Sequence, residues 1–144
     1  MTYWLVALAA LMFGIYNVFI KLSADHIQAV LGAVVLQLVA ALIGLAMLSY
    51  LYLGNVTTFN VTARGLWLSV LAGVAIGVVE IVSFLIYGRG MAVAVGNPLI
   101  VGGSLMVTTA VGVWLLREQL SLLQLSSVGL IMAGITLLAW SSTR

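Results

Sequence analysis

Glu80 is the residue of this sequence best suited to chemistry, because it stands alone within a long apolar run. A charged side chain at the centre of a membrane-spanning helix costs roughly 2.5–3.5 kcal/mol to insert. That cost falls if the carboxyl is protonated or faces a wet cavity. Its neighbours at spacings of three and four share one helical face with it, and that face is small and polar: Gly73, Gly77, Ser83 and Tyr87. Glu80 is therefore expected to bind a proton or a cation, or else to be a structural carboxyl bonded to another helix.

Three other apolar runs carry a similar stripe of small and mildly polar residues. Asn17 aligns with Gly14 and Lys21, Gln37 lies in the second run, and Ser104 lies in the fourth. A single serine in such a run often bonds its own helix backbone, but the repeated pattern favours faces that converge on a central cavity. The candidate residues for binding a substrate or a proton are Glu80, Asn17, Gln37, Ser83, Tyr87, Ser104 and Gly14.

Two cations near the ends of apolar runs, Lys21 and Arg89, are candidates for a vestibule that leads to this cavity. The alternative for Lys21 is that its long side chain reaches out to the lipid headgroups from the end of a helix.

The composition indicates whether water or lipid surrounds these side chains. Of the 144 residues, 65% are hydrophobic and 6% are charged, and the mean hydropathy is +1.32. Soluble domains carry about 25% charged residues, so this chain has too little polar surface to cover a globule in water. We therefore expect a multi-pass integral membrane protein that lies in a lipid bilayer.

Several function classes lack the residues they need. There is no cysteine, and His26 has no clustered partners, so no metal site or other cofactor is expected. The formal charge of +2 is scattered and does not indicate a nucleic-acid partner. We find no Gly-rich phosphate loop and no nucleophile with a plausible base, so an enzyme is not expected.

Five apolar runs are long enough to cross a hydrocarbon core as helices, which takes about 20 residues each. They cover residues 3–21, 29–53, 66–88, 97–116 and 122–140. Asn97 and Pro98 resemble the N-cap and first residue of a helix. Ser121 and Gln124 resemble a capping box, and Gly54 a C-terminal cap. The chain is thus expected to be an all-α membrane protein with one domain over residues 1–144.

Small residues recur at a spacing of four, which lets helices approach closely in lipid. The pairs are Ala10/Gly14, Ala40/Gly44, Gly73/Gly77 and Thr108/Gly112. They could serve helix packing inside one subunit or an interface between subunits. Tryptophans near the ends of the runs suit an interfacial aromatic belt: Trp4, Trp67, Trp114 and Trp140.

The cations show little preference for one side of the membrane. If five helices cross in turn, one side holds Arg64 and Arg117 and the other holds Lys21, Arg89 and Arg144. Positive loops normally fix the orientation of a membrane protein. The near balance is either uninformative, because the charges are few, or a sign of dual topology with copies inserted both ways.

Two stretches carry a resemblance to a known family. One is Tyr87–Leu99 with Leu115–Gln124, Gly129 and Gly134, and the other is Phe13–Lys21 with its Gly14, Asn17 and Lys21. Together they resemble the EamA-like domain of the drug/metabolite transporter superfamily. The resemblance covers nearly the whole chain, and Glu118 matches a motif position of that family.

The resemblance implies a particular assembly. Family members usually carry two five-helix domains in tandem, which insert with opposite orientation around a central site. This chain resembles one such domain, so it implies an antiparallel homodimer. The related small multidrug resistance transporters work in this way with an essential glutamate in the first helix. This sequence differs, since its membrane glutamate, Glu80, is in the third run.

The function expected from these observations is secondary transport by alternating access. The substrates would be small metabolites or organic cations, with protons as coupling ions in an antiporter. The protein would be located in the inner membrane of a prokaryotic cell. The alternatives are an uncoupled channel or facilitator, a flippase for lipid-linked sugars in which Lys21 and Arg89 contact phosphate, and an accessory subunit of a larger membrane complex.

Overall fold

The computed structural model is all-helical over the residues it describes, 2–54 and 60–142; Arg144 lies outside them. Its helices are α1 Tyr3–Ala24, α2 Ala29–Leu53, α3 Ala63–Gly88, α4 Val93–Trp114 and α5 Leu122–Ser142. All five are long and apolar enough to span a membrane. The expected all-α architecture with five membrane-spanning helices is therefore confirmed.

The caps explain several helix ends. The Gln28 side chain accepts a hydrogen bond from the Leu31 N–H at 2.9 Å, and α2 begins at the next residue and ends before Gly54, as expected. The capping box of α5 is also confirmed. The Ser121 N–H donates to Gln124 Oε1 at 2.8 Å, and the Gln124 N–H donates to Ser121 Oγ at 3.2 Å.

The start expected for the fourth helix was wrong. Residue 97 is not its N-cap, because α4 begins at Val93, capped by Ala92 with an extended backbone, and Pro98 lies inside the helix. The N–H groups of Val95 and Gly96 already donate to the Ala92 carbonyl. Proline cannot donate to the carbonyl four residues before it, but membrane helices tolerate such a gap where neighbouring groups compensate.

Other helix ends differ by a few residues from the expected ones. Helix α1 continues to Ala24 rather than 21, and α5 continues to Ser142 rather than 140. Helix α3 begins at Ala63 rather than 66, because the Thr62 hydroxyl accepts from the Gly65 N–H at 3.1 Å.

Helix α4 stops at Trp114, two residues before the expected end at 116. Arg117 takes a positive φ of 57°, and the chain turns back so that the Glu118 N–H donates to the Gly112 carbonyl at 2.9 Å.

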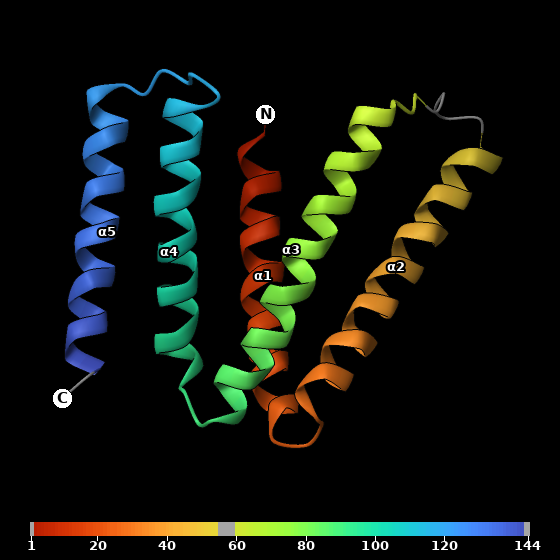
Figure 1. Ribbon diagram of the computed structural model, residues 1–144, viewed down its shortest axis with the longest axis horizontal. Coiled ribbons are helices and arrows are strands. Elements are labelled where there is room, and N and C mark those ends of the chain that lie inside the picture. The colour runs from red at the N-terminus through yellow and green to blue at the C-terminus, as the bar shows by residue number, and fades with distance from the viewer. Residues whose placement is uncertain (1, 55–59, 143–144) are drawn as a thin grey trace. The chain divides into compact units, whose positions relative to one another are not determined.

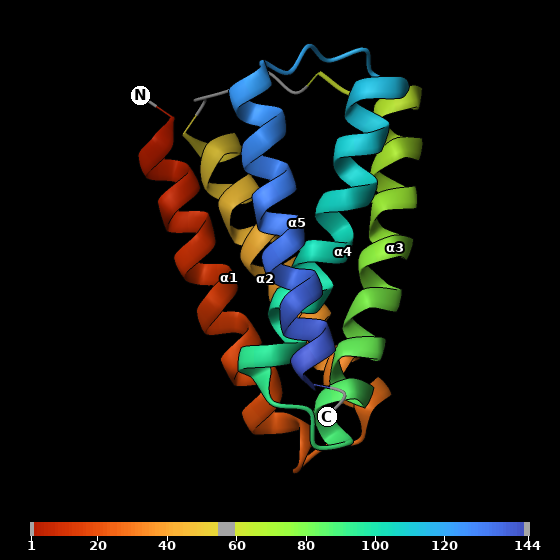
Figure 2. The same ribbon diagram turned by 90° about the vertical axis from the view of Figure 1, so that its left-hand side faces the viewer.

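The chain divides into two compact units, an N-terminal unit Met1–Gly90 and a C-terminal unit Met91–Arg144. In the N-terminal unit α3 packs against both α1 and α2. Successive helices run in opposite directions, so α1 and α3 are parallel and end beside the α1–α2 turn (Figures 1 and 2). In the C-terminal unit α4 and α5 form an antiparallel hairpin.

Close helix contacts occur at two glycines outside the expected small-residue pairs. A Cβ at Gly32 would lie 2.6 Å from the Phe84 ring, so α2 meets α3 there. A Cβ at Gly102 would overlap the Ile135 side chain, so α4 meets α5 there. Among the expected pairs, a Cβ at Gly14, Gly44 or Gly73 would meet no atom within 4 Å. These three positions leave open space instead of packing the subunit.

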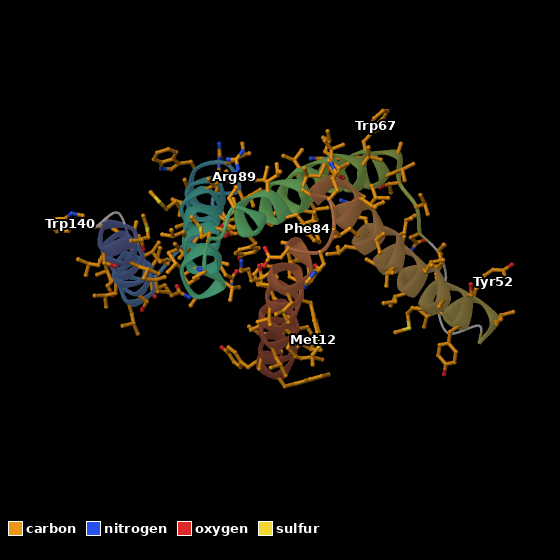
Figure 3. All side chains as sticks on the ribbon, turned by 90° about the horizontal axis from the view of Figure 1, so that it is seen from below. Met12, Tyr52, Trp67, Phe84, Arg89 and Trp140 are labelled. Carbon is orange, nitrogen blue, oxygen red and sulfur yellow. The ribbon has the colours of Figure 1, made fainter. Side chains whose placement is uncertain are left out.

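The four tryptophans lie near helix ends and are exposed, as a belt at the membrane surface requires. The exposed fractions of their side chains run from 61% to 82%: Trp4, Trp67, Trp114 and Trp140. Figure 3 shows Trp67 pointing away from the helices of its unit.

Candidate functional site

One face of α3 is buried, and it carries the only buried acid of the described residues. Glu80 is 3% exposed, Ser83 4%, and Tyr87 is fully buried. Spacings of three and four place these residues in line on one side of the helix. Glu80 lies eight residues before Gly88, the last residue of α3, which is about 12 Å along the axis. The face predicted from the sequence is therefore buried from Glu80 to the end of the helix.

Helix α1 packs against this face of α3, and its polar residues lie at the same level along the helix axes. Gly88 of α3 lies beside Ala24 of α1, since a Cβ on the glycine would be 3.4 Å from the Ala24 carbonyl oxygen. The two helices are parallel, so Asn17, seven residues before Ala24, lies level with the turn that carries Glu80. Asn17 is 4% exposed, and the polar positions of both helices thus meet at one level.

The Asn17 amide is bonded on both sides. Its Nδ2 donates to the Phe13 carbonyl at 2.8 Å, within its own helix. Its Oδ1 accepts from the Tyr87 hydroxyl at 3.4 Å, across the α1–α3 interface. Side chains of a helix lean toward its N-terminus, which lets the hydroxyl of Tyr87 reach back along α3 to this level.

Glu80 is only partly satisfied. The hydroxyl of Tyr16 on α1 hydrogen-bonds the Glu80 carboxyl. The second carboxyl oxygen, Oε2, is buried and has no hydrogen-bond partner among the described residues. An unpaired buried polar group costs about 1–3 kcal/mol, and more if it is charged. We call Tyr16, Asn17, Glu80, Ser83 and Tyr87 the polar cluster.

The two candidate vestibule cations lie at the end of α3. The Lys21 ammonium donates to the Tyr87 carbonyl at 2.9 Å and lies 3.9 Å from the Asp25 carboxylate. A cation that binds the last carbonyls of a helix stabilises its C-terminus. Lys21 therefore ties α1 to α3, while Arg89 is exposed and forms the C-cap of α3.

The remaining predicted residues lie outside the polar cluster. Gln37 of α2 is half-buried, and its amide nitrogen would lie 3.6 Å from a Cβ at Gly77 of α3. Gly14 of α1 is half-buried beside open space. Ser104 belongs to the C-terminal unit, where it is exposed and its hydroxyl donates to the Val101 carbonyl at 2.8 Å.

Sequence reasoning missed Tyr16, the partner of Glu80. The stripe assigned to α1 followed Gly14, Asn17 and Lys21, and Tyr16 lies one residue outside it. A tyrosine within an apolar run was the available signal, since a buried hydroxyl needs a partner. It also gave Asn97 only the role of an N-cap, whereas Asn97 lies inside α4 and its Oδ1 is buried without a hydrogen-bond partner among the described residues.

The polar side chains gathered here suit a proton or an organic cation better than a metal ion. Within residues 2–54 and 60–142, no three His, Cys, Asp or Glu side chains gather as metal ligands. The polar cluster instead offers one carboxyl, one amide and three hydroxyls. These groups can accept hydrogen bonds from, or neutralise, a protonated or cationic ligand.

Comparisons with protein-family models, with curated protein sequences and with solved structures found no match to this chain. The function must therefore be inferred from the polar cluster and from the helices that hold it.

Proposed function

We propose that this chain is a secondary transporter that moves small metabolites or organic cations across a prokaryotic inner membrane by alternating access. Glu80 binds a proton and the cationic group of the substrate in competition, as in an antiporter. The working form is an antiparallel homodimer of EamA-like half-transporters, in keeping with the resemblance described above.

The observation that carries this proposal is the unpartnered Oε2 of Glu80. Acids within membrane helices mark proton relays and substrate pathways, because their insertion cost is otherwise uncompensated. A purely structural glutamate would be expected to have both oxygens bonded. Here one oxygen is held by Tyr16, and the other is left for a proton or a ligand.

The chemistry of the polar cluster supports the choice of ligand. Glu80 is the only carboxyl of the polar cluster. Lys21, the cation of α1, already contacts the Tyr87 carbonyl and the Asp25 carboxylate. A cationic substrate would neutralise the carboxylate without removing an existing ion pair. A proton would do the same, so substrate and proton compete for one charge.

The test is transport by purified protein in proteoliposomes with an imposed pH gradient. Glu80→Gln keeps the size of the side chain and removes its charge and its titration. We expect it to abolish proton-driven uptake of methylammonium-type cations. Glu118→Gln is the matched control, since Glu118 is exposed in the α4–α5 turn. Normal gradient-driven transport by Glu80→Gln would refute the proposed role.

A further inference from the structure

The buried residues of α1, α2 and α3 all lie at one end of the N-terminal unit, which we call the packed end. On α1 they occur from Asn17 onward, on α2 no further than Ala33, and on α3 from Glu80 onward. The three helices converge there, beside the α1–α2 turn, and spread apart at their other ends (Figures 1 and 2). The polar cluster therefore belongs to the packed end, and Glu80 marks the limit of this end along α3.

The helices are no longer closely packed directly beyond Glu80. One turn before it on α3, a Cβ at Gly77 would meet only the Gln37 amide, and two turns before it a Cβ at Gly73 would meet no atom within 4 Å. A Cβ at Gly14 of α1 would also meet none. Packing thus closes the polar cluster toward the α1–α2 turn, whereas these positions leave space in the opposite direction.

A lysine ties the packed end together at its outer edge. The Lys21 ammonium of α1 donates to the Tyr87 carbonyl of α3 at 2.9 Å, and the Lys21 side chain is 25% exposed. The same Tyr87 donates its hydroxyl to Asn17 in the polar cluster. A shift of the end of α3 away from Lys21 would therefore also move a residue of the polar cluster.

Each partner of this hydrogen bond has a second partner close to it in the sequence. The Asp25 carboxylate, one turn after Lys21, lies 3.9 Å from the ammonium. The Tyr87 carbonyl also accepts from the Gly90 N–H at 3.0 Å. If the bond between α1 and α3 breaks, neither group is left unpaired, so the usual cost of an unsatisfied polar group is avoided. The bond is therefore suited to breaking and forming again.

We propose that Lys21 is a two-position switch that closes and opens the polar cluster toward the α1–α2 turn. In this structure its bond to the Tyr87 carbonyl closes that end. In the other position Lys21 pairs with Asp25 alone, the end of α3 moves away from α1, and water reaches Asn17 and Glu80 from this side. Small shifts of packed helices are a common form of such switching. This inference rests on the proposed function and names the contact that regulates access to Glu80.

The test measures water access to the packed end in nanodiscs, where reagent reaches both membrane faces. The chain has no cysteine, so Ile20→Cys introduces a single thiol beside Lys21, at a position that is 2% exposed. All variants carry this substitution, and a charged methanethiosulfonate reagent should label it slowly. Lys21→Met, which removes the bond to Tyr87, should raise the labelling rate about fivefold or more. Lys21→Arg keeps the cation and should restore the slow rate.

Asp25 distinguishes a switch from a purely structural contact. Asp25→Asn removes the charge that holds Lys21 in its second position, so it should lower the labelling rate about twofold. A contact that only stabilises the fold predicts no change or a faster rate. Arg89→Met is the matched control for a lost cation at this end, since Arg89 is exposed at the C-cap of α3, and it should leave labelling unchanged.

Three results of this labelling experiment would overturn the switch. The first is an unchanged or faster rate in Asp25→Asn, which decides the matter even if Lys21→Met does not fold. The second is an unchanged rate in a folded Lys21→Met protein. The third is a rate for Arg89→Met as high as that for Lys21→Met, because the effect would then follow from net charge.

A disulfide across the packed end tests whether this end has to open during transport. A Cβ on Gly88 would be 3.4 Å from the Ala24 carbonyl oxygen, so Ala24→Cys with Gly88→Cys places two thiols across the α1–α3 contact. Oxidation should abolish proton-driven uptake of methylammonium in proteoliposomes, and reduction should restore it. Full uptake by the cross-linked protein would overturn the proposal.

The switch and the proposed function can fail separately. If Glu80→Gln transports normally while Lys21→Met and Asp25→Asn shift labelling in opposite directions, the coupling role of Glu80 is refuted and the switch is retained. If Glu80→Gln loses gradient-driven uptake while Lys21→Met and Asp25→Asn both leave labelling unchanged, the switch is refuted and the role of Glu80 is retained.

Discussion

At the residue scale, the hydrogen bond from the Tyr87 hydroxyl to Asn17 joins two side chains across the α1–α3 interface. Both residues are buried. The Tyr87 hydroxyl lies 3.4 Å from Asn17 Oδ1, which is longer than the range of about 2.5–3.0 Å that is usual for an O–H···O bond. Measured hydrogen bonds between membrane helices contribute about 0.6 kcal/mol on average and at most about 1.7. The bond should therefore orient the Asn17 amide more than it stabilises the fold.

Tyr87→Phe tests this estimate. Removal of the hydroxyl leaves Asn17 Oδ1 buried without its donor, and we expect the free energy of unfolding to fall by about 0.5–1.5 kcal/mol. The measurement is unfolding in mixed micelles of mild detergent and SDS. Tyr50→Phe serves as the control, because Tyr50 is 70% exposed. Equal unfolding curves for the two variants would show that the bond contributes nothing.

The sequence could predict which residues are unusual but not all of their partners. Glu80, Ser83 and Tyr87 share a face by helical spacing alone, and that face is buried. Periodicity describes one helix at a time, so it could not show that Tyr16, rather than Lys21, faces the carboxyl. Nor could it show that Lys21 binds the Tyr87 carbonyl of α3. These residues are 66 positions apart in the sequence, and their contact depends on how α1 and α3 are aligned along their axes.

At the element scale, hydrophobic runs determined the helices, and local signals determined their ends unevenly. The capping box at Ser121 and Gln124 fixed the start of α5. The residue type of Pro98 favours the first position of a helix, but a proline is also tolerated inside membrane helices, and α4 starts five residues earlier. Residues 90–96, which precede Asn97, are apolar apart from the two glycines at their ends. Their composition alone does not tell whether they form a loop or the first turn of a helix.

Helix packing depends on which glycine faces a neighbour, and adjacent glycines of α4 test this. Gly102 is buried against Ile135 of α5, whereas a Cβ at Gly103 would meet no atom within 4 Å. Gly102→Ala should destabilise the α4–α5 hairpin by about 1–3 kcal/mol through overpacking. Gly103→Ala should be neutral or stabilising by up to about 1 kcal/mol, because alanine favours the helix.

Thermal unfolding of both variants in the same detergent measures the difference. The chemical change is identical and the positions are one residue apart, so unequal propensity cannot account for a gap between them. Equal melting temperatures would mean that Ile135 moves aside at no cost. The α4–α5 contact would then be looser than the position of Gly102 indicates.

At the scale of the whole molecule, the open problem is how a chain with one buried acid builds a pathway through the membrane. Gly14, Gly44 and Gly73 expose helix backbone to open space, which a single subunit does not use. An antiparallel second copy is the partner that our proposed function supplies. Cations that are nearly balanced between the two sides permit both orientations. If the five helices cross the membrane in turn, the sequence places Arg64 and Arg117 on one side and Lys21, Arg89 and Arg144 on the other.

Charge substitutions that favour one orientation test this assembly. Asn60→Lys with Arg89→Ala moves positive charge to the side of Arg64, and His26→Lys with Arg64→Ala moves it to the opposite side. For each variant, reporters fused to the C-terminus and active on opposite sides of the membrane should give one dominant signal. The unmodified chain should give both signals.

Transport then distinguishes an antiparallel dimer from any assembly of one orientation. If the working form needs two oppositely inserted copies, each biased variant alone loses most of its flux, because it has no partner of the other orientation. Co-expression of the two variants restores flux, since together they supply both orientations. The charge-preserving pair Asn60→Gln with Arg89→Lys should keep full activity alone. Full activity of either biased variant by itself would rule out the antiparallel dimer and leave a one-orientation assembly to carry the Glu80 site.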